Sequence, residues 1–317
     1  MRTILAADLG GTSLRAALVD EQGHLSARAE LDTPERATGD QMVETLVQLL
    51  SSVLATGGPA PAAACIASAG LIDGDHGRVI VSENIPGFRN LVLTEPVSER
   101  LGTPCFIEND ASAAALGEFR WGAGRGLRHL LHATLGTGIG GGIVINGRLY
   151  RGSRGLAGEI GHTVIDPAGP ACNCGSRGCV EALVSGFAFA ARARRLMASG
   201  KPTILNQLVQ GRPPDAVDLY AAAAAGDTLA EAEIRNGGHI LGLALGGMVN
   251  VLNPDAVTLS GGLLKMGDMF LQPLRDAMYS LPYGPASGTL VRLSELGDDT
   301  GLLGAAAVAI ERLDTPE

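Results

Sequence analysis

The sequence predicts an α/β protein of two domains with a cleft between them. Its 317 residues are 46% hydrophobic, which is enough for more than one buried core. Each half of the chain begins with strands that turn at glycine-rich sequences, and each half then alternates helices with strands. The domain boundary is therefore predicted near residues 111–124.

The first half is predicted to be a β-meander followed by alternating helices and strands. Apolar runs indicate strands over residues 3–8, 13–19 and 24–31. Asp40 is a candidate N-cap, and apolar residues follow it at helical spacing through Leu54. Further elements are predicted as a buried strand over 63–69, a short helix over 94–101, a buried strand over 105–108 and an alanine-rich helix after Asp110.

The second half repeats this order after Gly126. Strands are predicted over residues 129–135, 140–145 and 148–150, the last two joined by the hairpin signal Asn146-Gly147. A loop rich in glycine and cysteine covers 152–178. The remaining predicted elements are helices over 180–197, 229–252 and 300–313 and a strand over 256–260.

The bulk composition excludes several classes of protein. A net charge of -9, with no run of Lys or Arg longer than two, argues against nucleic acid or an anionic membrane as the main partner. Neither lysine, Lys201 or Lys265, fits a GxxxxGK[ST] phosphate loop. The N-terminal apolar run is too short for a signal peptide, and no stretch of ~18 apolar residues predicts a membrane span. We expect a cytoplasmic protein.

Two glycine-rich turns are candidate phosphate loops. In the first, a strand delivers Asp8, and Gly10, Gly11 and Thr12 turn the chain. Glycines let backbone N–H groups approach a phosphate, Thr12 adds a hydroxyl donor, and Asp8 could hold Mg²⁺ through water. The alternative is a plain tight hairpin with an aspartate at its mouth.

The second turn, Gly136-Thr137-Gly138, repeats this arrangement, and two such turns could grip a polyphosphate. Gly136, Gly138 and Gly141 also satisfy GxGxxG, with Glu159 at a suitable distance for a dinucleotide ribose. That fingerprint must open a helix, whereas a strand is predicted here, so the dinucleotide interpretation is disfavoured. Gly261-Gly262, after another strand, is a weaker candidate for contact with adenine or ribose.

Asn109 and Asp110 end a buried strand, where the polar residues of α/β folds often serve function. Asp110 could accept a proton from a substrate hydroxyl. The alternative is that Asp110 only caps the helix that follows, and both roles are compatible if Asn109 does the capping.

The strongest signal is His162 followed by Cys172, Cys174 and Cys179, because one imidazole and three thiolates form a closed tetrahedral site for structural zinc. The alternative is that these cysteines are reduced and merely pack. Glu159 and Glu181 flank the loop and suit sugar hydroxyls, although Glu181 could simply be an acidic residue in a first helical turn. Cys65 and Cys105 are expected to be inert core residues.

These motifs resemble those of the ROK family of repressors, open reading frames and kinases, and within it the bacterial glucokinases. The resemblance runs from Asp8 to the C-terminal helix and is most specific over residues 138–181, where GEIGH and CxCGxxGCxE are intact. It implies the two-domain, ribonuclease-H-like fold of actin and hexokinase, with an interdomain cleft. The implied domains are a small one at 1–115, on which a helix at about 300–317 packs back, and a large one at 116–299.

The resemblance also implies an activity and assigns roles. It implies an ATP-dependent hexose kinase of carbohydrate metabolism and glycolysis that uses Mg²⁺, carries structural Zn²⁺ and phosphorylates the 6-hydroxyl of glucose. Asp110 would be the catalytic base. Sugar contacts would come from Gly70, Asn84, Asn109, Asp110, Glu159, His162 and Glu181. The nucleotide would lie on Asp8, Gly10, Gly11, Thr12, Gly136, Thr137 and Gly138, with Gly261 and Gly262 as the weaker candidates already named. Zinc would be bound by His162, Cys172, Cys174 and Cys179.

The sequence departs from the family pattern at Ala69, where the family usually has proline, and at Phe88, where it often has tryptophan. Both departures leave the identity of the sugar open among glucose, N-acetylmannosamine, N-acetylglucosamine, fructose and allose. A sugar-responsive repressor is the alternative from another class, but the chain begins directly in the first predicted strand and has no basic helix. We further expect a homo-oligomer. Zinc is expected to affect sugar affinity through His162 and to leave ATP affinity nearly unchanged.

Overall fold

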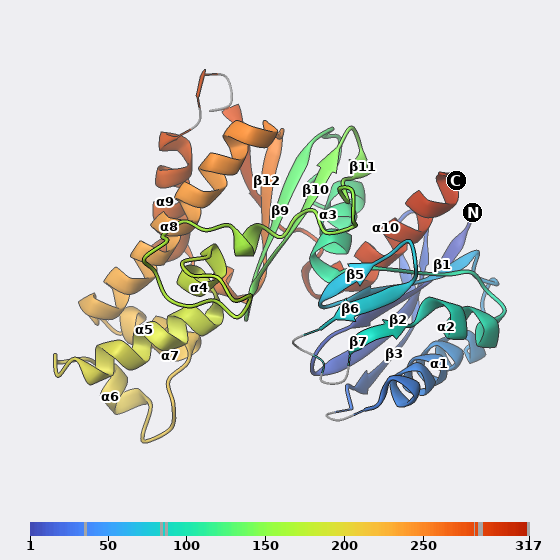
Figure 1. Cartoon of the computed structure of the whole chain (residues 1–317), viewed down its shortest axis with the longest axis horizontal. Coiled ribbons are helices and arrows are strands. Elements are labelled where there is room, and N and C mark those ends of the chain that lie inside the picture. Colours follow the sequence, from blue (N-terminus) through green and yellow to red (C-terminus); the bar gives the residue numbers. More distant parts are fainter. Residues whose placement is uncertain (35–36, 83–84, 86–87, 282, 285–287, 316–317) are drawn as a thin grey trace. The chain divides into compact units, whose positions relative to one another are not determined.

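The computed structural model describes residues 1–34, 37–82, 85, 88–281, 283–284 and 288–315. Within these residues the strands form two five-stranded sheets and one three-stranded sheet. Helices follow groups of strands along the chain (Figure 1). The predicted α/β class is confirmed. None of the helices described is both long and apolar enough to cross a membrane.

The strands are β1 (Thr3–Leu9), β2 (Ser13–Asp20), β3 (Leu25–Asp32), β4 (Ala63–Ser68), β5 (Leu71–Asp73), β6 (Arg78–Val81), β7 (Arg89–Val92), β8 (Cys105–Asn109), β9 (Leu130–Leu135), β10 (Ile139–Ile145), β11 (Arg148–Leu149), β12 (Ala256–Ser260) and β13 (Leu290–Leu293). The α-helices are α1 (Gly39–Ala55), α2 (Thr94–Leu101), α3 (Asp110–Trp121), α4 (Val180–Val184), α5 (Gly186–Ala198), α6 (Leu205–Leu208), α7 (Ala216–Ala224), α8 (Thr228–Leu252), α9 (Asp268–Ser280) and α10 (Thr300–Asp314).

The chain folds into two compact units. The first unit contains Met1–His132, Gly142–Gly158 and Ser294–Glu317, and the second contains Ala133–Gly141 and Glu159–Leu293. The predicted domain limits of 1–115 and 116–299 stay a prediction, and each unit is described by itself below.

The first unit is built on a sheet of order β3-β2-β1-β4-β8. The hairpin of β1 and β2 is antiparallel, whereas β1, β4 and β8 run parallel to one another. Alternate side chains of these strands and the apolar face of α1 form one buried core, with Leu5, Leu46 and Ile66 almost fully buried. The predicted strands and α1 are thus present, with ends shifted by one or two residues, but the N-cap of α1 is Thr38 and not the predicted Asp40, which lies in the first turn.

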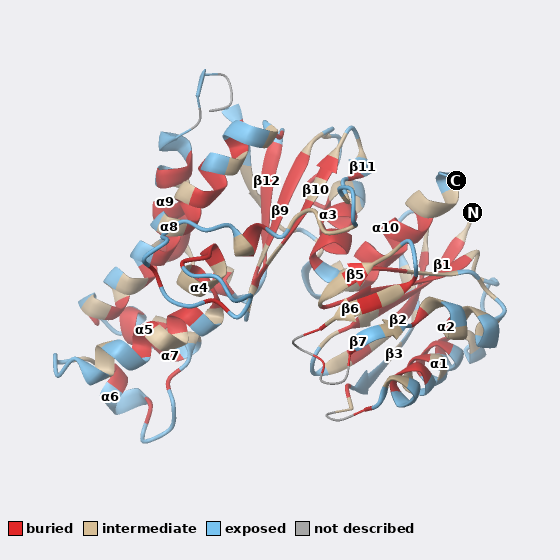
Figure 2. Ribbon diagram, viewed as in Figure 1, coloured by how far each residue is buried: buried red, intermediate tan, exposed pale blue. Residues whose placement is uncertain are grey.

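The C-terminal helix α10 completes this unit by packing on α3 and against β1 and β4, and both helices are largely buried (Figure 2). Glycines allow the close approach. A Cβ atom added at Gly304 would lie 2.5 Å from the carbonyl carbon of Ala113, and one added at Gly117 would lie 2.9 Å from the backbone nitrogen of Gly304. Because these contacts are with backbone atoms, a side chain at either position would push the two helices apart.

We predict that Gly304→Ala destabilises the protein by ~1–3 kcal/mol, the usual cost of overpacking. The matched control is Gly247→Ala in α8, where an added Cβ meets nothing within 4 Å. There the higher helix propensity of alanine should stabilise by ~0.5–1 kcal/mol. Thermal unfolding of both variants measures the difference, and equal effects of the two substitutions would contradict the close helix contact.

In the second unit, α8 and α9 pack closely along their lengths. The second five-stranded sheet has the order β11-β10-β9-β12-β13, and of it this unit contains residues 133–135 of β9, residues 139–141 of β10, and the parallel strands β12 and β13. The helix predicted over 180–197 is two helices, α4 and α5. The break lies at Ser185, which has extended backbone (φ -62°, ψ 170°) and whose hydroxyl accepts the N–H of Ala188 at 3.2 Å as an N-cap.

Candidate active site and metal centre

Three neighbouring strands of the first unit end at the same edge of the sheet. Leu9 of β1 is paired with Ser68 of β4, and Ser68 is paired with Asn109 of β8. The segments that follow these strands begin at Gly10, Ala69 and Asp110. This edge therefore collects the first glycine turn, the Gly70 turn and the predicted base.

The first glycine turn is held by Ser13 and by Thr33, the residue directly after β3. The N–H of Gly10 donates to the carbonyl of Ser13 at 3.0 Å. The Thr33 hydroxyl donates to the Gly10 carbonyl at 2.7 Å, and the Thr33 N–H donates to the Thr12 carbonyl at 3.0 Å. Gly11 and Thr12 remain exposed, which is the arrangement that a phosphate loop requires.

Asp8 is partly buried and is paired with Arg15, a residue that sequence analysis did not single out. The two residues face each other in the β1–β2 register, and Arg15 Nη2 donates to Asp8 Oδ2 at 2.5 Å. Arg15 also donates to the Asp298 carbonyl at 2.8 Å, just before α10. The sequence could have indicated this pair, because a hairpin centred between Gly11 and Thr12 places Asp8 opposite Arg15.

Asn109, not Asp110, is the N-cap of α3. Its side-chain oxygen accepts the N–H groups of Ala111 and Ser112, each at 3.0 Å, and its side-chain nitrogen donates to the Gly70 carbonyl at 3.1 Å. Gly70 has φ +118°, and a Cβ there would lie 2.5 Å from the Val81 carbonyl oxygen, so only glycine fits this turn. Asn84 lies outside the described residues.

Since Asn109 does the capping, the Asp110 carboxylate needs no capping role, although its Oδ1 accepts the Ala111 N–H at 2.8 Å. The pKa of Asp110 is raised above the usual aspartate range, first because surrounding protein displaces water and then because Asp8 is negatively charged, while the Ala111 N–H opposes the rise. The residue is exposed at the protein surface, so contact with water limits the size of this rise.

The end of β8, directly before Asp110, is braced by a second arginine that sequence analysis missed, Arg151. Its Nε donates to Glu108 Oε2 at 2.6 Å, and its Nη1 lies 2.8 Å from Oε2 of Glu311 on α10. The other oxygen of Glu108 accepts the N–H of Asn109 at 3.1 Å. The three residues are far apart in sequence, so no local pattern indicates this network.

The second glycine turn lies in the second unit. The N–H of Gly136 donates to the Gly138 carbonyl at 3.0 Å, and Thr137 at the tip is exposed. β10 begins directly at Ile139, so a strand follows the turn and the helix that a dinucleotide fingerprint needs is absent there. Gly261 lies beside this turn, because a Cβ added to it would be 2.3 Å from the Leu135 carbonyl oxygen.

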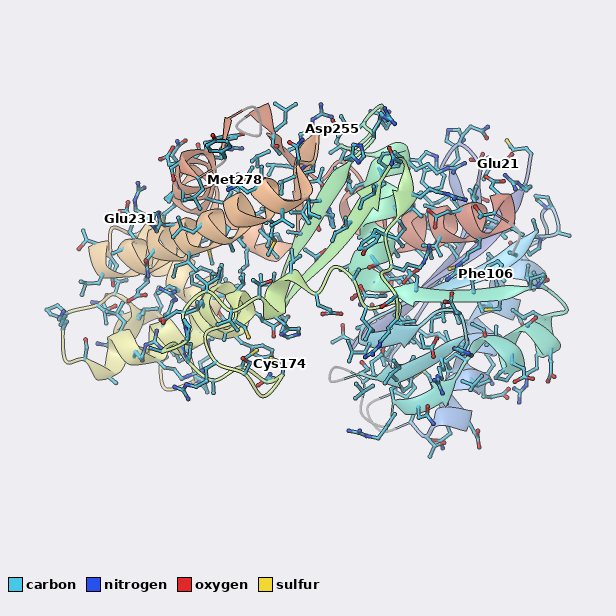
Figure 3. All side chains as sticks on the ribbon, turned by 45° about the horizontal axis from the view of Figure 1, so that its top comes forward. Glu21, Phe106, Cys174, Glu231, Asp255 and Met278 are labelled. Atoms are coloured by element: carbon cyan, nitrogen blue, oxygen red, sulfur yellow. The ribbon has the colours of Figure 1, made fainter. Side chains whose placement is uncertain are left out.

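The four predicted zinc ligands come together in the second unit. The ligand atoms of His162, Cys172, Cys174 and Cys179 all lie within 4.8 Å of one another, and Figure 3 labels Cys174 in its loop. The sulfur atoms of Cys174 and Cys179 are 3.7 Å apart, and Nδ1 of His162 is 3.7 Å from the sulfur of Cys172. Tetrahedral Zn²⁺ with Zn–S bonds of about 2.3 Å needs sulfur atoms about 3.8 Å apart, so the residues present fit this metal.

Two carboxylates flank the cluster in different ways. Glu159 is exposed, and its Oε2 lies 3.9 Å from Nε2 of His162, the ring nitrogen other than the one that faces Cys172. Glu181 is half-buried, and its Oε2 accepts the N–H of Ile139 at 3.0 Å, directly after the second glycine turn. The position of Glu181 against that turn was not anticipated from the sequence.

Comparison with known proteins decides the family. The model of the ROK family matches residues 4–312 of the chain. The chain belongs to the ROK family. It is 37% identical to the glucokinase of Thermotoga maritima, over 98% of both chains. It is 33% identical to the N-acetylmannosamine kinase of Citrobacter koseri, over 96% of this chain and 98% of the other.

Solved ROK structures confirm the predicted fold, the two-domain actin and hexokinase type. The ROK hexokinase of Thermus thermophilus has a TM-score of 0.86 at 32% identity, covering 99% of this chain and 100% of that one. The ROK glucokinase of Streptomyces griseus, solved in complex with glucose and AMPPNP, has a TM-score of 0.81 at 32% identity, covering 96% of this chain and 98% of that one.

Proposed function

We propose that this ROK protein is a kinase that transfers the γ-phosphoryl group of ATP to a hexose, with the 6-hydroxyl of glucose as the favoured acceptor. The observation that carries the proposal is the exposed Asp110 carboxylate at the end of β8, freed by the Asn109 cap for contact with a substrate. The likeness to glucokinases over 96–98% of the chain supports the choice of reaction and of glucose.

In the proposed reaction Asp110 accepts the proton of the attacking hydroxyl and orients that hydroxyl toward the γ-phosphorus. Phosphoryl transfer is in-line and asks little covalent chemistry of the protein, so positioning and neutralisation of charge dominate the rate. The Asn109 cap, the Gly70 bond and the brace from Glu108 to Arg151 would keep Asp110 in place.

The triphosphate would contact residues of the glycine turns, which are Gly10, Gly11, Thr12, Gly136, Thr137 and Gly138. Gly261 and Gly262, beside the second turn, would contact the nucleoside. Mg²⁺ bound with ATP would supply positive charge to the phosphates. Asp8 could face it through Oδ1, since Oδ2 is engaged by Arg15.

The sugar would be bound by Asp110, Gly70, Asn84, Asn109, Glu159, His162 and Glu181. Carboxylates and amides suit sugar hydroxyls because each accepts from more than one donor. The position of Nε2 of His162 near Glu159 supports this assignment, because an imidazole that binds zinc through Nδ1 presents a proton at Nε2. Zinc on His162, Cys172, Cys174 and Cys179 would fix this ring and the loop.

Glucose is expected to be phosphorylated with MgATP faster than the other hexoses. The measurement is a coupled assay of kcat/KM over a panel of glucose, N-acetylmannosamine, N-acetylglucosamine, fructose and allose. Because the chain is also 33% identical to the N-acetylmannosamine kinase of Citrobacter koseri, N-acetylmannosamine is the main alternative substrate. A higher kcat/KM for N-acetylmannosamine would replace the glucose assignment and keep the kinase, whereas no turnover of any hexose would refute the kinase.

We also propose that the protein works in the cytoplasm as a homo-oligomer. Five free cysteines, three of them gathered in a metal site, support a reducing compartment. Exposed apolar side chains of the second unit, such as Val251 (82% exposed) and Tyr283 (89% exposed), support an interface between copies. Light scattering of the purified protein measures the oligomeric state.

A further inference from the structure

The second glycine turn is held by the segments that flank the metal cluster. Oε2 of Glu181 accepts the Ile139 N–H at 3.0 Å. On the other side of the same residue, Gly161 lies so close that an added Cβ would be 2.2 Å from the Ile139 carbonyl oxygen. Ile139 therefore lies between Gly161, which directly precedes the ligand His162, and Glu181, which lies two positions after the ligand Cys179.

The rest of the turn is fixed by the chain that follows Glu181. The N–H of Gly186 donates to the Gly136 carbonyl at 2.9 Å, and the N–H of Phe187 donates to the Thr137 carbonyl at 3.4 Å. A Cβ added at Gly138 would lie 2.5 Å from Glu181 Oε2, so the turn and the carboxylate are in direct contact. All three residues of the turn thus contact the segment 181–187.

The two flanks of the cluster are also tied to each other. The N–H of Val180 donates to the Thr163 carbonyl at 3.0 Å, and Val164 forms an isolated bridge with Cys179. A metal ion bound by both His162 and Cys179 would add a second link between the two flanks, beside the hydrogen bond from Val180 to Thr163. Loss of the ion would release both contacts on Ile139 together.

We propose that Glu181 is a positioning residue for the Gly136–Gly138 turn and that through it the metal cluster sets the affinity of the protein for nucleotide. The inference rests on the proposed function, because it takes this turn to be a phosphate loop. One oxygen of Glu181 accepts the Ile139 N–H. This N–H therefore helps to order the loop and does not donate to a phosphate. A preformed loop binds a phosphate more tightly because less ordering remains to be done on binding.

From the sequence we expected the phosphate loops to lie away from the metal, so that zinc would affect sugar affinity and leave ATP affinity nearly unchanged. The structure puts Ile139 against both flanks of the cluster. Removing the metal is now expected to weaken nucleotide binding as well as sugar binding.

The test is titration calorimetry of the zinc-loaded protein with Mg²⁺ and AMPPNP in the absence of sugar. Glu181→Ala is expected to weaken AMPPNP binding about tenfold or more, the scale of one hydrogen bond to a charged group, while zinc stays at one per chain. Glu181→Gln keeps an acceptor for the Ile139 N–H and should recover most of the affinity. The matched control is Glu231→Ala in α8, which removes a half-exposed carboxylate 3.9 Å from Arg235 and should leave AMPPNP affinity within about twofold.

A second measurement does not depend on nucleotide. Hydrogen exchange of the peptide spanning Ile139 is expected to quicken in Glu181→Ala and in Cys174→Ser, while exchange around Gly10 stays as in the parent. Unchanged exchange at Ile139 in both variants, or parental AMPPNP affinity in folded Glu181→Ala, would overturn the inference. A parent chain that binds no AMPPNP would refute the proposed function instead, and the exchange measurement would still decide whether Glu181 braces the turn.

Discussion

Replacing Asp110 by alanine is expected to lower kcat by ~10²–10⁴-fold, the usual contribution of a positioned general base. Sugar and nucleotide affinity should change much less, because the other proposed contacts remain. Helix α3 should also persist, since Asn109 provides its N-cap. Steady-state kinetics with glucose and MgATP measures the loss, and thermal unfolding verifies the fold.

Two further variants distinguish a catalytic base at Asp110 from a residue that only stabilises the start of its helix. Asp110→Asn keeps the size of the side chain and an oxygen for the Ala111 N–H, so it should be nearly as slow as alanine if the proton acceptor is what matters. Asp268→Ala removes an exposed aspartate from the first turn of another helix and should leave kcat unchanged. A kcat near that of the parent in Asp110→Asn would show that Asp110 is not the base.

The raised pKa of Asp110 also predicts how kcat/KM depends on pH. The carboxylate must be ionised to accept a proton, so kcat/KM should fall on the acid side, at a pH above the ordinary aspartate pKa of about 4. The Asp110→Asn variant should lose this acid limb.

Replacing Cys174 by serine is expected to remove the zinc and with it most of the activity. A serine hydroxyl is a poor zinc ligand, and the remaining three ligands cannot close a tetrahedral site. Because the binding energy of structural zinc is also folding energy, residues 152–178 should lose order, and kcat/KM should fall by about 10² or more through misplacement of the groups around them. Elemental analysis of the purified variant gives the zinc content beside the kinetics.

The control for the zinc variant is Cys105→Ser, a free cysteine outside the cluster. Burial raises the pKa of the Cys105 thiol to about 12, so this cysteine stays protonated and is no metal ligand. The control should retain one zinc per chain. A folded, zinc-free Cys174→Ser protein with parental kcat/KM would refute the role assigned to the metal.

Features that depend on neighbouring residues in the sequence could be predicted well. The Cys172, Cys174 and Cys179 spacing brings three ligands together almost regardless of the rest of the fold, and the structure gathers them with His162. The glycine turns were likewise predicted, because a hairpin of β1 and β2 is local. Strong apolar periodicity predicted α1 and α8 within a few residues.

Features that depend on long-range contacts could not be predicted. The sheet of β5, β6 and β7 has strands of three or four residues, too short for a clear alternation. Helix α9 contains Pro273, which by itself argues against a helix, yet packing on α8 holds it. The bond from Glu181 to Ile139 and the brace from Arg151 to Glu108 join residues about forty positions apart, so no window of sequence contains both partners.

The place of α10 has a consequence for how the chain folds during synthesis. The first unit takes its sheet of β1, β2, β3, β4 and β8 from the start of the chain and its last helix from the end, where α10 covers β1, β4 and α3. The residues of the second unit are all translated before α10, so that unit can fold first although it is encoded later than β1. Until α10 is synthesised, the sheet of the first unit keeps an uncovered apolar face, and we expect chaperones to bind this face and truncated chains that lack α10 to aggregate.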